Sequence, residues 1–162
     1  MKKKALFLDD FRIPLDVIHY TRDEALHVLY IEENWEIVRN YEEFTAEIKK
    51  WGLENFDVIS LDHDLGESAM FEYYNNVKDN YMIDYSNITE KTGYDAAKFL
   101  VAESMNTNKP LPQIYVHSAN PIGSANIIGY VNNYFKNIRS EQKCVHVEIE
   151  HYIEERFHLS PE

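Results

Sequence analysis

Three short apolar runs end abruptly in ionisable residues, and this pattern limits the possible folds more than any other feature. The runs ALFL, VISL and IYV are followed by Asp9-Asp10, Asp62-His63-Asp64 and His117-Ser118. Continuous apolar runs are typical of strands that helices cover on both faces, as in parallel sheets. Such sheets bind ligands at the carboxyl ends of their strands. We therefore expect the three polar groups to lie along one edge of a sheet.

Segments with helical periodicity separate these runs. Apolar residues recur at helical spacing in YEEFTAEIKKWG (41–52), GYDAAKFLVAESM (93–105) and PIGSANIIGYVNNYFKNI (121–138). Gly52 suits the end of the first helix, and Asn120 and Pro121 suit the N-cap and first residue of the third. WEIVRN (35–40) and the alternating KCVHVEIEHY (143–152) are interpreted as two more strands. Strands that alternate with helices indicate an α/β domain with a mostly parallel sheet.

Two internal segments are harder to interpret. Residues 13–34 combine a turn, apolar fragments and a short helical stretch around 23–29. Residues 67–91 are rich in Tyr, Asn and acids, and we interpret them as an insertion between the third strand and the next helix. Long loops are usually lids or disordered segments, and the aromatic content favours an ordered lid. The tail, 152–162, is interpreted as a last helical turn or a frayed end.

Length, cysteine count and charge narrow the class of protein. A chain of 162 residues with 44% hydrophobic residues fits one domain, 1–162, with a substantial core. Cys144 is alone, which excludes an internal disulfide and a cysteine-rich zinc site, and we expect it to be buried. No apolar run has membrane-spanning length and no signal-peptide pattern follows Met1, so we expect a cytoplasmic protein without membrane contacts. The net charge of −12 argues against an extended nucleic-acid surface but allows a small phosphate ligand or one nucleic-acid end.

The acids that follow the first and third strands are candidate metal ligands. Asp9, Asp10 and Asp62 would converge at the sheet edge, where three carboxylates repel one another unless a cation lies among them. Mg²⁺ prefers such oxygen ligands. In the opposing interpretation, one acid caps a helix and another pairs with Arg12. Asp64 is either an outer ligand or a turn or helix cap.

Two histidines lie at the same predicted edge. His63 and His117 could act as general acid and general base around one phosphate, because imidazole gains and loses a proton near neutral pH. Either could instead bind the metal, or form only structural hydrogen bonds.

The run HSANPIGSAN is a candidate phosphate site. Ser118 and Asn120 offer a hydroxyl and an amide just before a helix start, and Gly123 lets backbone amides approach an anion. Simple capping of the helix by Asn120 is compatible with this. Arg12 could neutralise the acids or clamp a phosphate. Thr92 is expected to cap the second helix and to border the site.

Four motifs give the chain a family resemblance: LDDFRIP (8–14), ISLDHDLG (59–66), TGYDAAKFL (92–100) and VHSANPIGSANI (116–127). The acidic pair, the strand-ending Asp62 and Ser118-Ala119 resemble a response-regulator receiver domain, in which the three acids hold Mg²⁺. Receivers carry a Lys at the end of their fifth strand, which CVHVEIEHY lacks, and they lack His63 and His117. The combination of DHDLG with HSANP is closer to the receiver-derived family of cyclic-phosphate processing receiver domains.

This resemblance implies a fold and an activity. The fold is a three-layer, receiver-like (flavodoxin-like) α/β domain with a mostly parallel five-stranded sheet in the order 2-1-3-4-5. The activity is that of a metal-dependent phosphoesterase acting on cyclic phosphates, with 2′,3′-cyclic phosphate nucleotides or RNA ends in RNA repair as candidate substrates. The expected cofactor is Mg²⁺ or Mn²⁺.

Two non-enzymatic hypotheses compete with this one. The chain could be a non-catalytic receiver-like module that binds a protein partner, for example through residues 67–91. It could also be an acidic protein that imitates nucleic acid. The histidines favour the enzyme, because neither competing function needs imidazoles beside an acidic cluster.

Overall fold

The apolar runs form one parallel sheet in the computed structural model, which describes residues 2–149. Its strands are β1 (Lys4–Leu8), β2 (Trp35–Val38), β3 (Phe56–Leu61), β4 (Gln113–Val116) and β5 (Val145–His146). All neighbouring strands pair in parallel, in the order 2-1-3-4-5. The expected fold class and strand order are confirmed. β5 is shorter than the strand that we expected over residues 143–152. Residues 150–152 lie outside the described range, as does the tail at 152–162.

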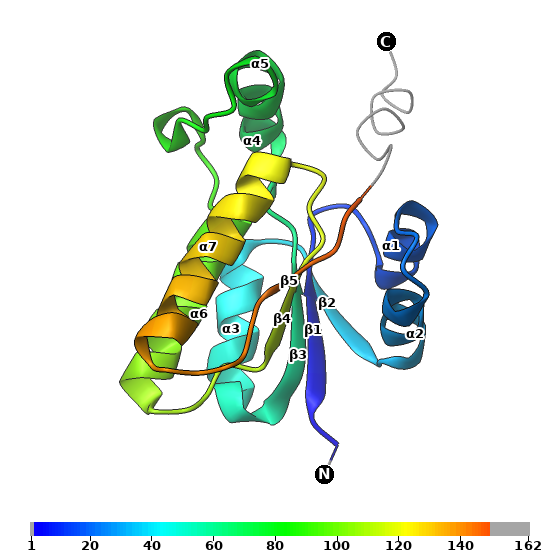
Figure 1. Ribbon diagram of the computed structural model, residues 1–162, viewed down its shortest axis with the longest axis vertical. Helices are drawn as coiled ribbons and strands as arrows, with labels where there is room; N and C mark the ends of the chain where they lie inside the picture. Colours follow the sequence, from blue (N-terminus) through cyan, green and yellow to red (C-terminus); the bar gives the residue numbers. More distant parts are fainter. Residues whose placement is uncertain (1, 150–162) are drawn as a thin grey trace.

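Helices cover both faces of the sheet (Figure 1). On one side lie α1 (Pro14–Tyr20) and α2 (Glu24–Glu32), and on the other lie α3 (Tyr41–Trp51), α6 (Gly93–Thr107) and α7 (Pro121–Asn137). Successive side chains of a strand point to opposite faces. Leu6 and Leu8 of β1 therefore join the larger apolar cluster, with α3, α6 and α7, while Phe7 joins the smaller one, with Val17 and Tyr30. Cys144 is buried, as expected.

The ends of the helices follow from local chemistry. Gly52 has a φ of 84°, a left-handed conformation that glycine adopts readily, and it ends α3 as predicted. Asn120 caps α7 through its side chain, and Pro121 is the first residue of that helix. The helix α1 was not predicted. It starts at Pro14, and the Asp16 side chain accepts a hydrogen bond of 2.9 Å from the backbone nitrogen of Ile13.

Residues 67–91 are helical over much of their length. They form α4 (Glu67–Glu72), the π-helix η2 (Tyr73–Val77), α5 (Lys78–Asn80) and the short 3₁₀-helix η3 (Tyr85–Asn87); another 3₁₀-helix, η1 (Leu53–Asn55), precedes β3. In Figure 1, α4 and α5 lie at the end of the molecule where α7 begins, which is also the end at which the strands finish. The segment therefore lies near the edge where a ligand is expected.

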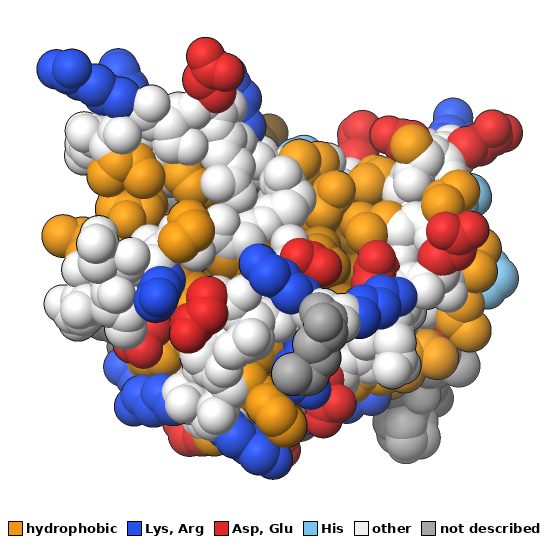
Figure 2. Space-filling model, turned by 90° about the horizontal axis from the view of Figure 1, so that it is seen from below, with side chains coloured by type: hydrophobic (Ala, Val, Ile, Leu, Met, Phe, Trp, Pro, Cys, Tyr) orange, Lys and Arg blue, Asp and Glu red, His pale blue; other side chains and the backbone are white. Residues whose placement is uncertain are grey.

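The opposite end of the molecule carries a mixed surface. Viewed from the end at which β1 starts, basic and acidic side chains are interspersed with hydrophobic ones (Figure 2). Among residues 2–149, no helix combines the length and the apolar character needed to cross a membrane.

Candidate active site

The register of the sheet brings the three polar groups together. Leu8 pairs with Leu61, and Leu61 pairs with Val116. The next residue of each strand continues this alignment, because Asp62 donates its backbone N–H to Leu8 (2.9 Å) and His117 donates to Leu61 (2.9 Å). Asp9, Asp62 and His117 therefore lie side by side at the carboxyl edge.

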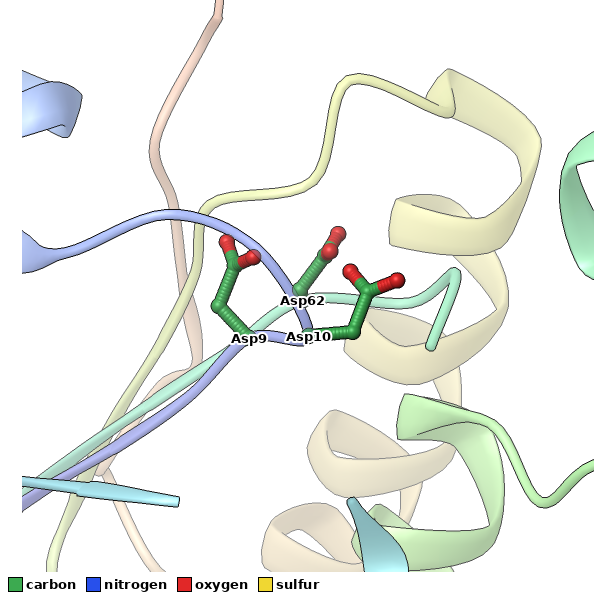
Figure 3. A group of neighbouring side chains, drawn as sticks. All are labelled: Asp9, Asp10 and Asp62. Carbon is green, nitrogen blue, oxygen red and sulfur yellow. The ribbon is translucent and has the colours of Figure 1, made fainter. Parts of the chain in front are cut away.

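The three predicted metal ligands form one cluster. Asp9, Asp10 and Asp62 each offer a carboxylate oxygen, and these oxygens lie within 4.8 Å of one another. Figure 3 shows the three carboxylates rising from the ends of β1 and β3 toward the same side. Asp9 and Asp62 are buried, and Asp10 is half-buried. Asp64 does not belong to this cluster; its Oδ1 lies 2.6 Å from Nδ1 of His63.

Four donors surround the Asp9 carboxylate. Its Oδ1 accepts hydrogen bonds from the backbone nitrogens of Phe11 (2.9 Å) and Arg12 (2.8 Å). Its Oδ2 lies 2.8 Å from Nε of Arg12 and 3.0 Å from Nε2 of His117. The Arg12 guanidinium also reaches Asp62, with Nη2 3.4 Å from Oδ1. Arg12, which is only 1% exposed, thus offsets part of the negative charge of Asp9 and Asp62.

These contacts give the two buried acids opposite pKa shifts. Burial alone would raise the pKa of Asp9, but the Arg12 charge and the His117 hydrogen bond outweigh it and hold the pKa well below its usual range. Burial and the charge of Asp9 raise the pKa of Asp62 well above its usual range, despite Arg12. The cluster thus carries more negative charge than the protein compensates. A hard divalent cation would supply the missing positive charge.

His117 is buried beneath the cluster in a chain of hydrogen bonds. Its Nε2 faces Asp9, its Nδ1 lies 2.6 Å from Oγ of Ser60, and Ser60 in turn lies 2.6 Å from the hydroxyl of Tyr30. Phe7 stacks on the imidazole at a centroid distance of 4.4 Å. Burial lowers the pKa of His117 to about 4. The ring is therefore neutral at pH 7, and it donates from Nε2 because a carboxylate only accepts.

His63 is equally buried but has different partners. Its Nδ1 faces Asp64, and its Nε2 lies 3.0 Å from the hydroxyl of Tyr85, which comes from the 67–91 segment. Asn120 Nδ2 donates to the same Asp64 oxygen at 3.2 Å. The two predicted histidines thus have both ring nitrogens engaged, His117 below the acidic cluster and His63 beside it.

Two glycines let helices α6 and α7 approach this edge. A Cβ at Gly93 would lie 1.8 Å from the backbone oxygen of Asp62, and one at Gly123 would lie 2.4 Å from the His63 ring. The backbone N–H of Gly93 also donates to the carbonyl oxygen of His63 at 2.8 Å. Both positions accept only glycine without a shift of the surrounding backbone or ring.

The predicted phosphate-binding residues form the caps of these helices. Asn120 Oδ1 accepts the N–H of Gly123 (2.9 Å), and Ser118 Oγ accepts the N–H of Asn120 (3.1 Å). Thr92 Oγ1 accepts the N–H of Tyr94 (3.1 Å), so Thr92 caps α6 as expected. The Ser118 hydroxyl retains a hydrogen that it can donate, since its oxygen acts as the acceptor.

Several residues of the site were missed in the sequence. Ser60 is a polar residue within the apolar run VISL, and that interruption was a usable signal. Tyr30 and Tyr85 lie in the two segments that resisted interpretation. Arg39 follows β2, and its Nη1 donates to the backbone oxygens of Asp9 (3.1 Å) and Arg12 (2.6 Å), which holds the β1–α1 loop.

Comparison with known proteins identifies a family. A family model described as cyclic-phosphate processing receiver domain matches residues 4–133, which include all four motifs and every residue of the edge described above. No curated protein and no solved structure matches the chain.

Proposed function

The chain belongs to the cyclic-phosphate processing receiver family, and we propose that it is a metal-dependent phosphoesterase acting on cyclic phosphates. The candidate substrates are nucleotides or RNA ends that carry a 2′,3′-cyclic phosphate. The observation that carries this proposal is the convergence of three carboxylates within 4.8 Å beside two buried histidines.

The acidic cluster supplies the support for a metal. Asp9, Asp10 and Asp62 would hold Mg²⁺ or Mn²⁺, with Asp64 as an outer group. Such an ion, when bound, neutralises phosphate charge and lowers the pKa of a bound water. Asp9 already has four donors around its two oxygens, whereas the His63 backbone N–H and Arg12 Nη2 both face Oδ1 of Asp62, so Asp62 has more lone pairs to offer.

The two histidines would have different roles in the proposed reaction. In our proposal His117 acts through Asp9, because its ring is buried and its Nε2 bonds that carboxylate. His63 is the candidate proton acceptor, because Asp64 holds its Nδ1 and its basic site is then Nε2, which faces the hydroxyl of Tyr85. Phosphate oxygens would be held at the neighbouring helix start by the Ser118 hydroxyl, Asn120 and the Gly123 turn, with Thr92 and Arg12 at the border.

The end of β5 supports a departure from phosphorelay signalling. Val116 pairs with His146, and the next residue, Val147, donates its N–H to Val116 at 2.8 Å. A buried valine therefore lies beside His117 at the end of β5, and no lysine follows His146 in the sequence.

A non-catalytic binding module is the second candidate function. The observation in its favour is the exposure of large apolar side chains on residues 67–91, at Phe71 (64%), Tyr81 (76%) and Met82 (66%). A protein partner could cover them without any chemistry at the acidic cluster.

The deciding experiment incubates the purified protein with 2′,3′-cyclic nucleotides in Mg²⁺, in Mn²⁺ and in EDTA. Metal-dependent ring opening that the Asp10→Asn variant lacks is the expected result. Asp79→Asn, an exposed acid on α5, is the matched control. Absence of both turnover and nucleotide binding would favour the binding module.

A further inference from the structure

Tyr85 links the 67–91 segment to His63. Its hydroxyl lies 3.0 Å from Nε2 of His63 and accepts a hydrogen bond of 3.0 Å from Nδ2 of Asn126 on α7. Its ring stacks on Tyr94 of α6 at a centroid distance of 5.3 Å. The phenol is thus held by groups from β3's end, α6 and α7, although Tyr85 itself belongs to η3.

The partners at the two ends fix the direction of this hydrogen-bond chain. The Asn126 amide nitrogen only donates, and the Asp64 carboxylate accepts. Around a neutral His63 ring, the Tyr85 hydroxyl therefore accepts from Asn126 and donates its own hydrogen to Nε2, and the Nδ1–H of His63 donates to Asp64. Burial raises the pKa of Tyr85 to about 12, so the phenol keeps this hydrogen at neutral pH.

Internal hydrogen bonds brace the segment that carries Tyr85. Glu72 of α4 accepts from the backbone nitrogen of Asp84 (2.9 Å), Nδ2 of Asn87 (2.9 Å) and Nδ2 of Asn76 (2.7 Å). These contacts fix both ends of the short turn that contains Tyr85.

A second glutamate, Glu90, accepts from the Ser68 hydroxyl and from the backbone nitrogen of Ala69. The segment therefore presents Tyr85 from a rigid support.

We propose that Tyr85 is a positioning residue of the active site, which together with Asp64 holds His63 in the Nδ1–H tautomer by donating its O–H to Nε2. In this role the 67–91 segment completes the site. Without it, the rest of the domain would hold only Nδ1 of the His63 ring, through Asp64. The kinetic part of this inference rests on the proposed phosphoesterase function, and the tautomer part does not.

The direct test is the ¹⁵N NMR spectrum of the His63 ring in the full chain at neutral pH with Mg²⁺. The wild type should show a protonated Nδ1 and an unprotonated Nε2. Tyr85→Phe, which removes only the hydroxyl, should shift the Nε2 signal, because its lone pair loses the O–H donor while Asp64 still accepts from Nδ1. Asn126→Ala should do the same to a smaller extent, and Tyr81→Phe, an exposed tyrosine of the same segment, should leave the His63 signals unchanged. Unaltered His63 signals in Tyr85→Phe would overturn the inference.

The kinetic test uses a 2′,3′-cyclic nucleotide as substrate. Tyr85→Phe should lower kcat about fivefold, the size expected for one neutral hydrogen bond, and leave KM and the Mn²⁺ affinity unchanged. A change in KM alone would overturn the positioning role, because it would mean that Tyr85 contacts the substrate. A wild type without any turnover would refute the proposed function, and the NMR comparison would still decide the role of Tyr85.

Discussion

Nε2 of His117 lies 3.0 Å from Oδ2 of Asp9, so this imidazole supports a carboxylate of the acidic cluster from below. Ser60 holds the other nitrogen of the same ring, Nδ1, and Phe7 stacks on the face of the ring. His117 thus donates from Nε2, whereas in our proposal His63 accepts there.

Replacing His117 should weaken metal binding. Hydrogen-bond partners of metal ligands typically contribute about 10–100-fold to affinity, and we expect about a tenfold loss of Mn²⁺ affinity in His117→Leu, which cannot donate to Asp9. His117→Gln retains an N–H donor and should lose less. Titration of Mn²⁺ by electron paramagnetic resonance measures both, with circular dichroism as the check on folding. Equal affinities in the two variants would contradict the supporting role.

Neutralising Asp62 should stabilise the metal-free protein. Burial and the Asp9 charge raise the pKa of Asp62, so its charged form is unfavourable in the folded state at pH 7. We expect Asp62→Asn to raise the stability in EDTA by about 1 kcal/mol, or roughly 2–4 °C in Tm, and to abolish the further rise that Mg²⁺ gives the wild type. Thermal unfolding in EDTA and in Mg²⁺ tests this. Asp57→Asn, an exposed acid on the same strand, should change neither value.

The stability of the metal-free protein should depend on His117 below neutral pH. The pKa of His117 falls from 6.5 to about 4 on folding, so between these values the unfolded chain binds a proton that the folded protein does not. This contribution is fully present above pH 6.5 and is lost as the pH falls toward 4, by up to about 3 kcal/mol. Asp9, whose pKa is also lowered, acts in the same direction at lower pH, and Asp62 opposes both. Urea unfolding at pH 7 and pH 4.5 should show a smaller difference for His117→Gln than for the wild type.

Three glycine variants should separate close packing from helix propensity. Gly93→Ala places a methyl group against the backbone at Asp62, and we expect a loss of about 3 kcal/mol or more. Gly123→Ala meets the His63 ring, so it should disturb the His63 NMR signals as well as stability. Gly129→Ala, in open space on α7, should be neutral or stabilising by up to about 1 kcal/mol. Urea unfolding of the three variants provides the comparison, and a harmless Gly93→Ala would refute the close approach.

The sheet edge was predictable because its signals are local. Apolar runs define the strands, and Asp9, Asp62 and His117 follow them directly, so parallel pairing is sufficient to bring them together. The helix caps at Asn120 and Thr92 were predictable for the same reason. The role of Ser118, Asn120 and Gly123 toward a phosphate stays a prediction.

The partners of the histidines were not predictable because they come from distant segments. Tyr30 reaches Ser60 from α2, and Tyr85 reaches His63 from the 67–91 segment, where periodicity gave no clear element. The short helix α1 was missed because its seven residues are too few to show a repeating pattern. The mutual arrangement of these side chains depends on tertiary packing, which a single sequence does not display.

The aligned register of β1 and β3 makes the acidic cluster depend on the correct pairing of these two strands. Its ligands come from strands far apart in the sequence, and a slip of one residue in β3 would put Leu61 where Asp62 should be and turn every side chain of that strand to the other face. A chain in which β1 and β3 are not paired in this register therefore has no binding site. Metal affinity should appear once these two strands have paired correctly, and a bound ion would then stabilise that pairing against any other register.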